Sequence, residues 1–328
     1  MNGIMFVNNE YEKKLVDTIV KEKNINIESY LGDINKYNEQ DLDKYDAVIG
    51  YSPKIDREVL QRFANHSIKY YITRSTGFNH IDLVAAKELG IRVANVRAYS
   101  PNAIAELALA LVMNLNRQIS MLSYDIHNKD FSRPQKLAKE IRDCTIGILG
   151  TGNIGVVSAK YYQAMGAKVI GYDKYPNAKY GDILEYLSFQ EVIENSDILL
   201  IHLPYIKEET FHLINLETLS KAKPHLIIVN TARGELVNLA DIETLIRTNK
   251  LAGYGADVFE FEEKYLGKKV EEIDDPIIKT ALELYPKIIL TPHIGASTER
   301  AIHSMNEIAI ENFIEFVNTG ECKNEIIG

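Results

Sequence analysis

Short apolar runs alternate with longer polar or amphipathic stretches through the first hundred residues. The runs with the composition of buried strands are IMFV at 4–7, DAVIG at 46–50, IKYYIT at 68–73 and IRVANV at 91–96. Segments such as 11–22 and 81–89 lie between them and carry the mixture of polar and apolar residues found in surface helices. Strands that alternate with helical segments are typical of a parallel sheet with crossover helices.

A second alternating series begins with TIGILG at 145–150. Further apolar runs follow at 168–172, 197–201, 226–230, 252–257 and 287–291. Six such runs separated by helical stretches match the order of a doubly wound dinucleotide-binding sheet. The pattern therefore predicts an α/β protein with two Rossmann-like domains, each built on a doubly wound parallel sheet.

Two long helices are predicted outside these strand series. The first begins after Ser100, a good N-cap, with Pro101 at its first position. It is apolar on nearly every face through Leu115, so other parts of the protein must cover it, and a second subunit is one candidate for part of that cover. The second helix, at 298–318, is amphipathic, and Gly320 is a plausible stop for it.

Composition narrows the class of protein. A length of 328 residues favours two domains. The net charge of −9, without any basic block, argues against a nucleic-acid partner. No apolar run reaches the roughly 18 residues of a membrane helix, and the N-terminus does not resemble a signal peptide. Cys144 and Cys322 are too few for a disulfide framework or a metal site, which favours the reducing cytoplasm.

The stretch GILGTGNIG carries a nucleotide-binding signature. Gly150, Gly152 and Gly155 follow an apolar strand and open a helix, where glycines allow a tight turn, a close phosphate and close helix packing. Asp173 ends the next strand run, where its carboxylate would bind both ribose hydroxyls and repel a 2′-phosphate. The signature therefore predicts NAD rather than NADP, against the alternative of a glycine-rich turn beside a surface aspartate.

Polar side chains follow four of the predicted strands at the edge where parallel sheets bind ligands. They are Arg233, the group Glu260, Glu262 and Glu263, His293, and His202. An arginine that binds an acid, a histidine that exchanges a proton and a carboxylate that orients the imidazole together suggest hydride transfer. The alternatives are a surface salt bridge for the arginine and a solvated face for the glutamates, among which spacing does not choose. His202 has no carboxylate nearby in sequence and is expected to be structural.

Four motifs in order resemble those of the D-isomer-specific 2-hydroxyacid dehydrogenases. They are GTGNIG with Asp173, VNTARGELVN, DVFEFE and TPHIGAST, and the likeness extends over the whole chain. The resemblance implies a catalytic trio of Arg233, Glu262 and His293. Residues 73–106 and the stretch between Glu262 and His293 resemble the D-lactate dehydrogenase branch, and IHLPYIKE and TGECKNEI resemble (R)-2-hydroxyglutarate dehydrogenase.

The resemblance also implies ligand contacts and a domain arrangement. The amides of Thr76 and Gly77 would bind the substrate carboxylate, and Tyr99 would face the substrate. The implied NAD-binding residues are Gly150, Gly152, Asn153, Ile154, Gly155, Asp173, Pro204, Thr231, Ala232 and Asp257. A flavodoxin-like substrate domain would comprise 1–100 and 299–328 and the NAD domain 101–298, with a cleft between them. A homodimer would form through 101–122.

Three positions depart from the branch and bear on the substrate. Ser297 stands where an aromatic residue is usual, Tyr51 where the hydroxyglutarate enzyme is expected to carry an arginine nearby, and Arg97 where proline is common. Arg97 would then be available for a distal carboxylate. Pyruvate, reduced to D-lactate, is the first expectation, with (R)-2-hydroxyglutarate and 2-hydroxyisocaproate dehydrogenase as alternatives. An NAD-sensing corepressor-like binding protein is the alternative of another class.

Overall fold

The computed structural model describes residues 1–51, 54–133 and 137–326. The chain forms two compact units, one of Met1–Ser100 with Ser297–Gly328 and the other of Pro101–Ala296. The predicted boundary places Ser297 and Thr298 in the second unit, and the predicted end of the first unit, 328, lies two residues beyond those described. Ser297 and Thr298 belong to the first unit because Thr298 caps its last helix, accepting a hydrogen bond from the amide of Ala301.

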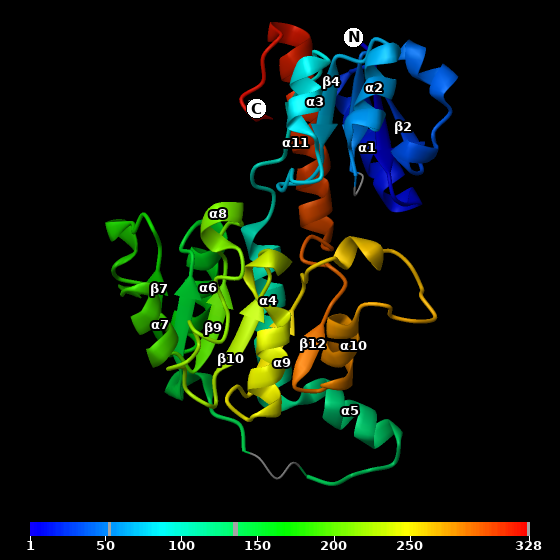
Figure 1. Ribbon diagram of the computed structural model, residues 1–328. Helices are drawn as coiled ribbons and strands as arrows, with labels where there is room; N and C mark the ends of the chain where they lie inside the picture. The colour runs from blue at the N-terminus through cyan, green and yellow to red at the C-terminus, as the bar shows by residue number, and fades with distance from the viewer. Residues whose placement is uncertain (52–53, 134–136, 327–328) are drawn as a thin grey trace. The chain divides into compact units, whose positions relative to one another are not determined.

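The first unit is built on one sheet with the order β13-β5-β4-β3-β1-β2 (Figure 1). Its strands are β1 (Gly3–Val7), β2 (Ile27–Leu31), β3 (Ala47–Gly50), β4 (Tyr70–Thr73), β5 (Arg92–Ala94) and β13 (Glu325–Ile326). The first five are parallel, and β13 runs antiparallel to β5. The sequence analysis missed β2, which is half exposed at the sheet edge, and β13, which is too short to show a pattern.

Helices cover both faces of this sheet. They are α1 (Glu10–Lys23), α2 (Arg57–Asn65), α3 (Leu83–Glu88) and α11 (Glu299–Thr319), with 3₁₀ turns at Ile34–Lys36 and Glu39–Lys44. Ile4 and Phe6 of β1 join the cluster that α2 and α3 cover, whereas Met5 and Val7 join the one that α1 and α11 cover. Alternate residues of a strand point to opposite faces, so a strand buried on both faces appears as a continuous apolar run.

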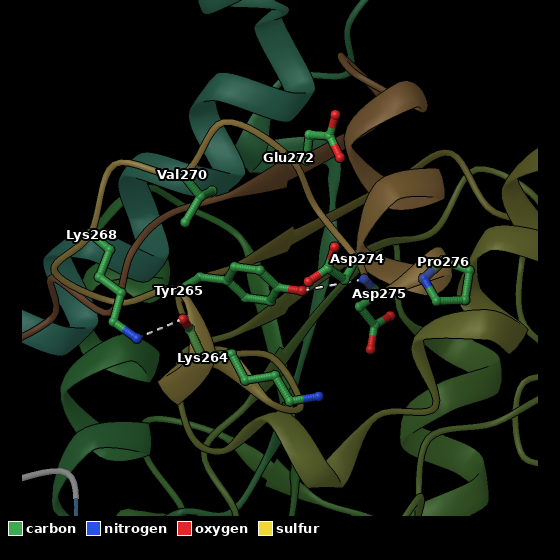
Figure 2. Close-up of a pocket in the computed structure, with 8 residues that line it drawn as sticks. All are labelled: Lys264, Tyr265, Lys268, Val270, Glu272, Asp274, Asp275 and Pro276. Atoms are coloured by element: carbon green, nitrogen blue, oxygen red, sulfur yellow. Dashed lines mark hydrogen bonds between the residues drawn. The ribbon is translucent and has the colours of Figure 1, made fainter.

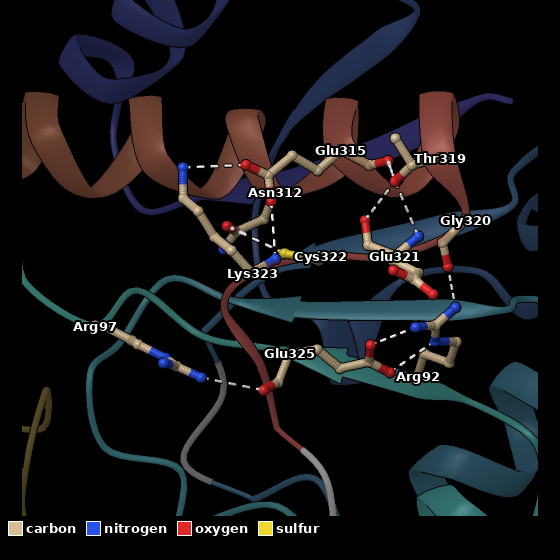
Figure 3. A network of polar contacts seen from close by, with 10 residues as sticks. All are labelled: Arg92, Arg97, Asn312, Glu315, Thr319, Gly320, Glu321, Cys322, Lys323 and Glu325. Carbon is tan, nitrogen blue, oxygen red and sulfur yellow. Dashed lines mark hydrogen bonds and ion pairs between the residues drawn. The ribbon is translucent and has the colours of Figure 1, made fainter.

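The C-terminal segment is tied to the first unit by a polar network (Figure 3). The helix α11 ends at Gly320, which has the left-handed φ of 74° that glycine adopts without strain. Beyond it, the guanidinium of Arg92 donates to both carboxylate oxygens of Glu325 and to the carbonyl of Gly320. Asn312 accepts from the side-chain amide of Asn324 at 2.8 Å. These contacts secure β13 on the sheet edge.

The second unit holds a parallel sheet with the order β12-β11-β10-β9-β6-β7-β8 (Figure 1). Its strands are β6 (Thr145–Leu149), β7 (Lys168–Tyr172), β8 (Glu185–Tyr186), β9 (Ile198–Ile201), β10 (Ile227–Asn230), β11 (Gly253–Ala256) and β12 (Ile288–Leu290). All six predicted runs are strands, and only the two-residue β8 was missed. The strand order reverses between β6 and β9, which is where such sheets bind ligands.

Helices flank this sheet on two faces. They are α4 (Pro101–Arg117), α5 (Ile119–His127), α6 (Asn153–Ala164), α7 (Phe189–Asn195), α8 (Lys207–Thr210), α9 (Leu239–Arg247) and α10 (Pro276–Glu283), with 3₁₀ turns at Ile141–Asp143, Ala178–Tyr180, Gly234–Leu236 and Glu262–Lys264. One apolar cluster joins α4 and α6 to the sheet, and the other joins α7, α9 and α10. Among the described residues, no helix is long and apolar enough to cross a bilayer.

The apolar helix α4 obtains much of its cover within its own unit. It packs against α6, β10 and β11. Gly253 and Gly255 of β11 permit this approach, because a Cβ on either would lie 3.1–3.2 Å from the side chain of Leu115. The apolar composition of α4 predicted that other elements bury it. The sheet and α6 bury one side of the helix.

Candidate active site

The glycine-rich turn after β6 has the geometry that the sequence predicted. Gly150 has a φ of +90°, and a Cβ on it would lie 2.6 Å from the carbonyl oxygen of His202. A Cβ on Gly155 would lie 2.0 Å from the carbonyl oxygen of Gly150, so only glycine lets α6 approach the strand. Apart from Gly152 and its two chain neighbours, no atom of the described residues lies within 4 Å of a Cβ on Gly152, which leaves space in front of the helix. The first turn of α6 has no side-chain cap and is suited to a phosphate.

The ends of the neighbouring strands complete a surface that fits a dinucleotide. Asp173 follows β7, and its carboxylate accepts hydrogen bonds from the amide of Thr151 at 2.7 Å and the amide of Tyr175 at 2.9 Å. The hydroxyl of Thr231, after β10, is buried without a hydrogen-bond partner among the described residues. The ten residues predicted to contact NAD all follow the carboxyl ends of β6, β7, β9, β10 and β11.

Replacing Asp173 by serine is expected to weaken the preference for NADH over NADPH by about 10- to 100-fold. The carboxylate would accept hydrogen bonds from both ribose hydroxyls and repel a 2′-phosphate, whereas the neutral hydroxyl of serine accepts more weakly and repels no phosphate. The check is the ratio of kcat/KM for the two cofactors. Asp143→Ser, at an exposed position before β6, is the control and should leave the ratio unchanged. A parent enzyme that uses NADPH equally well would refute this role.

A glutamate and a histidine meet at the carboxyl edge of the sheet. His293 follows β12, and its Nδ1 lies 2.6 Å from Oε1 of Glu262, which follows β11. The other oxygen of Glu262 accepts from the amide of Phe259 at 3.1 Å, so the carboxylate is held from two sides. The glutamate is 17% exposed and the histidine 41%. When Nδ1 donates to the carboxylate, Nε2 is the atom that exchanges a proton with a reactant.

The structure distinguishes the three neighbouring glutamates. Glu262 bonds His293, Glu260 bonds His212 at 2.9 Å, and Glu263 is exposed. Only Glu262 is therefore placed to orient the imidazole of His293.

Arg233 lies at the end of β10, beside the segment that carries Glu262. A Cβ on the next residue, Gly234, would lie 2.3 Å from the carbonyl carbon of Phe259, so the two segments are in backbone contact. The guanidinium donates to the carbonyl of Ala232 at 2.6 Å. An arginine, a carboxylate and a histidine thus follow three adjacent strands, an arrangement able to bind an acid and protonate a neighbouring carbonyl.

Asp257 has a supporting role that the sequence analysis did not foresee. Its buried carboxylate accepts from the hydroxyl of Thr291 at 2.6 Å and from the amides of Ile294 and Gly295 at 2.9 and 2.8 Å. Its carbonyl accepts from the amide of His293 at 3.0 Å. Burial raises the pKa of Asp257 despite these bonds. Asp257, predicted as a cofactor contact, therefore also fixes the loop that presents His293.

His202 is a structural residue, as its sequence context suggested. Its Nε2 lies 3.0 Å from the hydroxyl of Ser158, and its Nδ1 is buried without a partner among the described residues. Burial lowers the pKa of His202 to about 4, so the ring is neutral near pH 7. It cannot serve as a proton donor at that pH.

Acid is expected to destabilise the fold through His202. Unfolding returns the group to an ordinary pKa near 6.5, so between about pH 6.5 and pH 4 the unfolded chain binds the extra proton. His202→Gln should remove up to about 1.4 kcal/mol per pH unit from the fall in unfolding free energy across that window. Urea unfolding at pH 7 and pH 5 checks this, and an identical pH dependence in the two proteins would contradict it.

One cavity in the second unit is lined by none of the three predicted catalytic residues. It has a volume of about 650 Å³ and lies between the turn after Glu262 and the start of α10 (Figure 2). The amide of Asp275 donates to the hydroxyl of Tyr265 at 3.3 Å, and Lys268 bonds the carbonyl of Lys264 at 3.0 Å. Lysines and acidic residues share its lining, so it lacks the single sign of charge that would concentrate one kind of ion.

The residues predicted to bind substrate lie in the first unit. Thr76 and Gly77 follow β4, and their carbonyl oxygens accept from Asn95 Nδ2 at 2.7 Å and from Ser75 Oγ at 2.6 Å. Within the described residues, neither amide of this pair donates a hydrogen bond. Tyr99 packs partly buried against the apolar cluster under α1 and α11. Sequence reasoning missed Asn95, although an asparagine within the apolar run IRVANV was a signal.

Comparisons with known proteins agree over the whole chain. The family described as "D-isomer specific 2-hydroxyacid dehydrogenase, NAD binding domain" matches residues 109–295. An aromatic 2-oxoacid reductase of Clostridium sporogenes is 36% identical over 82% of each chain. A D-lactate dehydrogenase of Lactiplantibacillus plantarum is 32% identical over 97% of this chain and 92% of its own.

Solved structures show the same architecture. A D-lactate dehydrogenase of Treponema pallidum superposes with a TM-score of 0.91 at 32% identity, covering 100% of both chains. A D-lactate dehydrogenase of Lactobacillus jensenii with NAD⁺ gives 0.87 at 31% identity, again over 100% of both chains. With the glycine turn and the trio of strand-end residues, these matches establish that the chain belongs to the D-isomer-specific 2-hydroxyacid dehydrogenase family and is an NAD-dependent oxidoreductase.

Proposed function

We propose that the enzyme reduces pyruvate to D-lactate with NADH. The observation that carries the chemistry is the 2.6 Å contact between His293 Nδ1 and Glu262 Oε1. The D-lactate dehydrogenases of Lactiplantibacillus plantarum and Treponema pallidum, 32% and 35% identical over more than nine-tenths of this chain, support pyruvate as the oxo acid.

Each member of the trio has one task in this proposal. His293 donates the proton from Nε2 to the oxygen of the substrate carbonyl, and Glu262 stabilises the charged imidazolium and its orientation. Arg233 binds the substrate carboxylate and polarises the carbonyl. The bound dinucleotide supplies the hydride. The amides of Thr76 and Gly77 add hydrogen bonds to the carboxylate, a role supported by their lack of partners within the described residues, and Tyr99 faces the substrate.

Aromatic 2-oxo acids are the second candidate. The rings of Tyr51 and Phe78 are exposed at the carboxyl edge of the first sheet, after β3 and β4, and would pack against an aromatic side chain. The aromatic 2-oxoacid reductases of Clostridium sporogenes support this reading. A distal carboxylate, as in 2-oxoglutarate, is the third candidate, because Arg97 is exposed and uses one of its five N–H groups to donate to the carbonyl of Glu325 at 3.3 Å (Figure 3).

A panel of 2-oxo acids separates these candidates. We would measure kcat/KM with NADH for pyruvate, phenylpyruvate, 2-oxoisocaproate, 2-oxoglutarate, glyoxylate and hydroxypyruvate. A highest value for pyruvate supports the proposal, and a highest value for phenylpyruvate supports the second candidate. Turnover of none of the six would refute both.

We also propose a cytoplasmic homodimer in which residues 101–122 contribute to the interface. The short helix α5 has no buried residue, and Ile119 at its start is 53% exposed. Two free, buried cysteines suit a reducing compartment. Ile119→Glu should reduce the mass measured by light scattering to that of one chain. Val84→Glu, at an exposed position in the other unit, is the control. A single-chain mass in the parent would exclude the dimer.

A further inference from the structure

A second glutamate–histidine pair lies next to the catalytic one. Nε2 of His212 is 2.9 Å from Oε2 of Glu260, and Glu260 precedes the catalytic Glu262 by two positions. Both side chains are mostly buried, at 28% and 20% exposure, so the contact is less exposed to solvent than a typical surface ion pair. Within the described residues, neither side chain bonds His293 or Arg233, and the pair is linked to Glu262 through the short turn that Glu260 and Glu262 share.

The imidazole of His212 is fixed before it meets Glu260. Its ring stacks on Phe211 with the centroids 3.9 Å apart and the planes 16° from parallel. Its backbone has a left-handed φ of 48°, and its amide donates to the carbonyl of Glu235 at 2.8 Å. Its carbonyl in turn accepts from the side chain of Asn215 at 2.8 Å. The ring and backbone of His212 are therefore held in place by other contacts, with Nε2 directed at Glu260.

The turn that carries Glu262 needs such support. Phe261 has a left-handed φ of 63°, a strained conformation for a residue that has a side chain. The backbone of Phe259 and Glu260 touches Gly234, next to Arg233. His212 contacts the segments that carry Arg233 and Glu262. Its amide donates to the carbonyl of Glu235, and its ring bonds Glu260. Three segments thus interlock, and two of them carry catalytic side chains.

We propose that Glu260 and His212 are positioning residues for the reaction. Their hydrogen bond holds the turn 259–262 in the conformation in which the carboxylate of Glu262 meets Nδ1 of His293. A contact of 2.6 Å tolerates little movement of the turn, and residues that orient a catalytic group in this way commonly affect turnover without touching substrate. The inference rests on the reaction of the family and does not depend on which 2-oxo acid is preferred.

The test uses the full-length enzyme with whichever 2-oxo acid it reduces best. Glu260→Ala should lower kcat about tenfold, because the turn loses its anchor, while the KM for NADH stays within about twofold. A carboxylate held against an imidazole favours the protonated ring. The fall of kcat/KM at high pH should therefore move to lower pH in this variant. Glu260→Gln, which keeps an acceptor for His212, should restore most of kcat.

Two further variants keep the test decisive. Glu263→Ala removes an exposed glutamate from the same run and should leave kcat and the pH profile unchanged. His212→Asn removes the same hydrogen bond from the other side, and asparagine adopts left-handed backbone readily. It should reproduce the loss in kcat and the shift in pH profile even if Glu260→Ala fails to fold. Folded Glu260→Ala or His212→Asn enzyme with the parent's kcat and pH profile would overturn the proposal, as would an equal loss in Glu263→Ala.

Discussion

Replacing His293 by alanine is expected to lower kcat for reduction of the 2-oxo acid by about 10²- to 10⁴-fold. The imidazole lies at the end of β12 with Nδ1 bound to Glu262, which leaves Nε2 available for the proposed donation of a proton to the substrate oxygen. Without it, the alkoxide formed on hydride transfer must take its proton from water. Affinity for NADH should change little, because the nucleotide-binding turn is built by other residues.

The measurement is kcat by NADH oxidation together with the Kd for NADH from fluorescence. His293→Asn is the matched variant, since asparagine accepts the left-handed φ of 54° at this position with little strain. Similar losses in both variants would assign the effect to the missing imidazole and not to the backbone. A fall in NADH affinity as large as the fall in kcat would instead make His293 a structural residue.

Arg233→Gln is expected to reduce kcat/KM for the 2-oxo acid by about 10²- to 10³-fold. Glutamine keeps a polar side chain but is shorter than arginine and lacks the charge and the paired donors that would bind a carboxylate and polarise the carbonyl. Arg233→Lys should recover only part of the loss, because an ammonium cannot reproduce the planar fork. The Kd for NADH should remain near that of the parent.

A control arginine separates this role from a general effect of charge. Arg142 precedes β6 and is 71% exposed, so Arg142→Gln removes the same charge at a distance from the strand ends. It should leave kcat/KM unchanged. If Arg233→Gln lost no more activity than Arg142→Gln, Arg233 would not contact the substrate.

Much of the fold could be predicted because a strand that is buried on both faces consists of consecutive apolar residues, which are visible in the sequence. All six strands predicted in the second unit are present for this reason. The elements that escaped were β2, β8 and β13, which lie at sheet edges and are short or partly exposed. The boundary at 297–298 was missed because Thr298 belongs with the helix that it caps, a fact that depends on where that helix packs.

The candidate site also has some features that the sequence could predict and others that only the structure shows. The role of Gly155 is local, because the turn that it packs against and the helix that follows it lie within one short segment. Spacing alone could not choose Glu262 over Glu260 and Glu263, and the family resemblance was needed to do so. The structure distinguishes the three by their partners, one of which is His212, about 50 residues away along the chain.

By itself the sequence determined the α/β class, the parallel strands of the two sheets, the nucleotide turn and the set of polar residues at the strand ends from which the candidate site is drawn. These follow from periodicity and from short motifs whose members are near neighbours along the chain. Only the tertiary structure decided that Asp257 holds the loop of His293, that His202 is buried and neutral, and that Glu260 is bound by His212. Each of these depends on side chains from distant segments meeting at one sheet edge, where burial and hydrogen bonding set what a polar group can do.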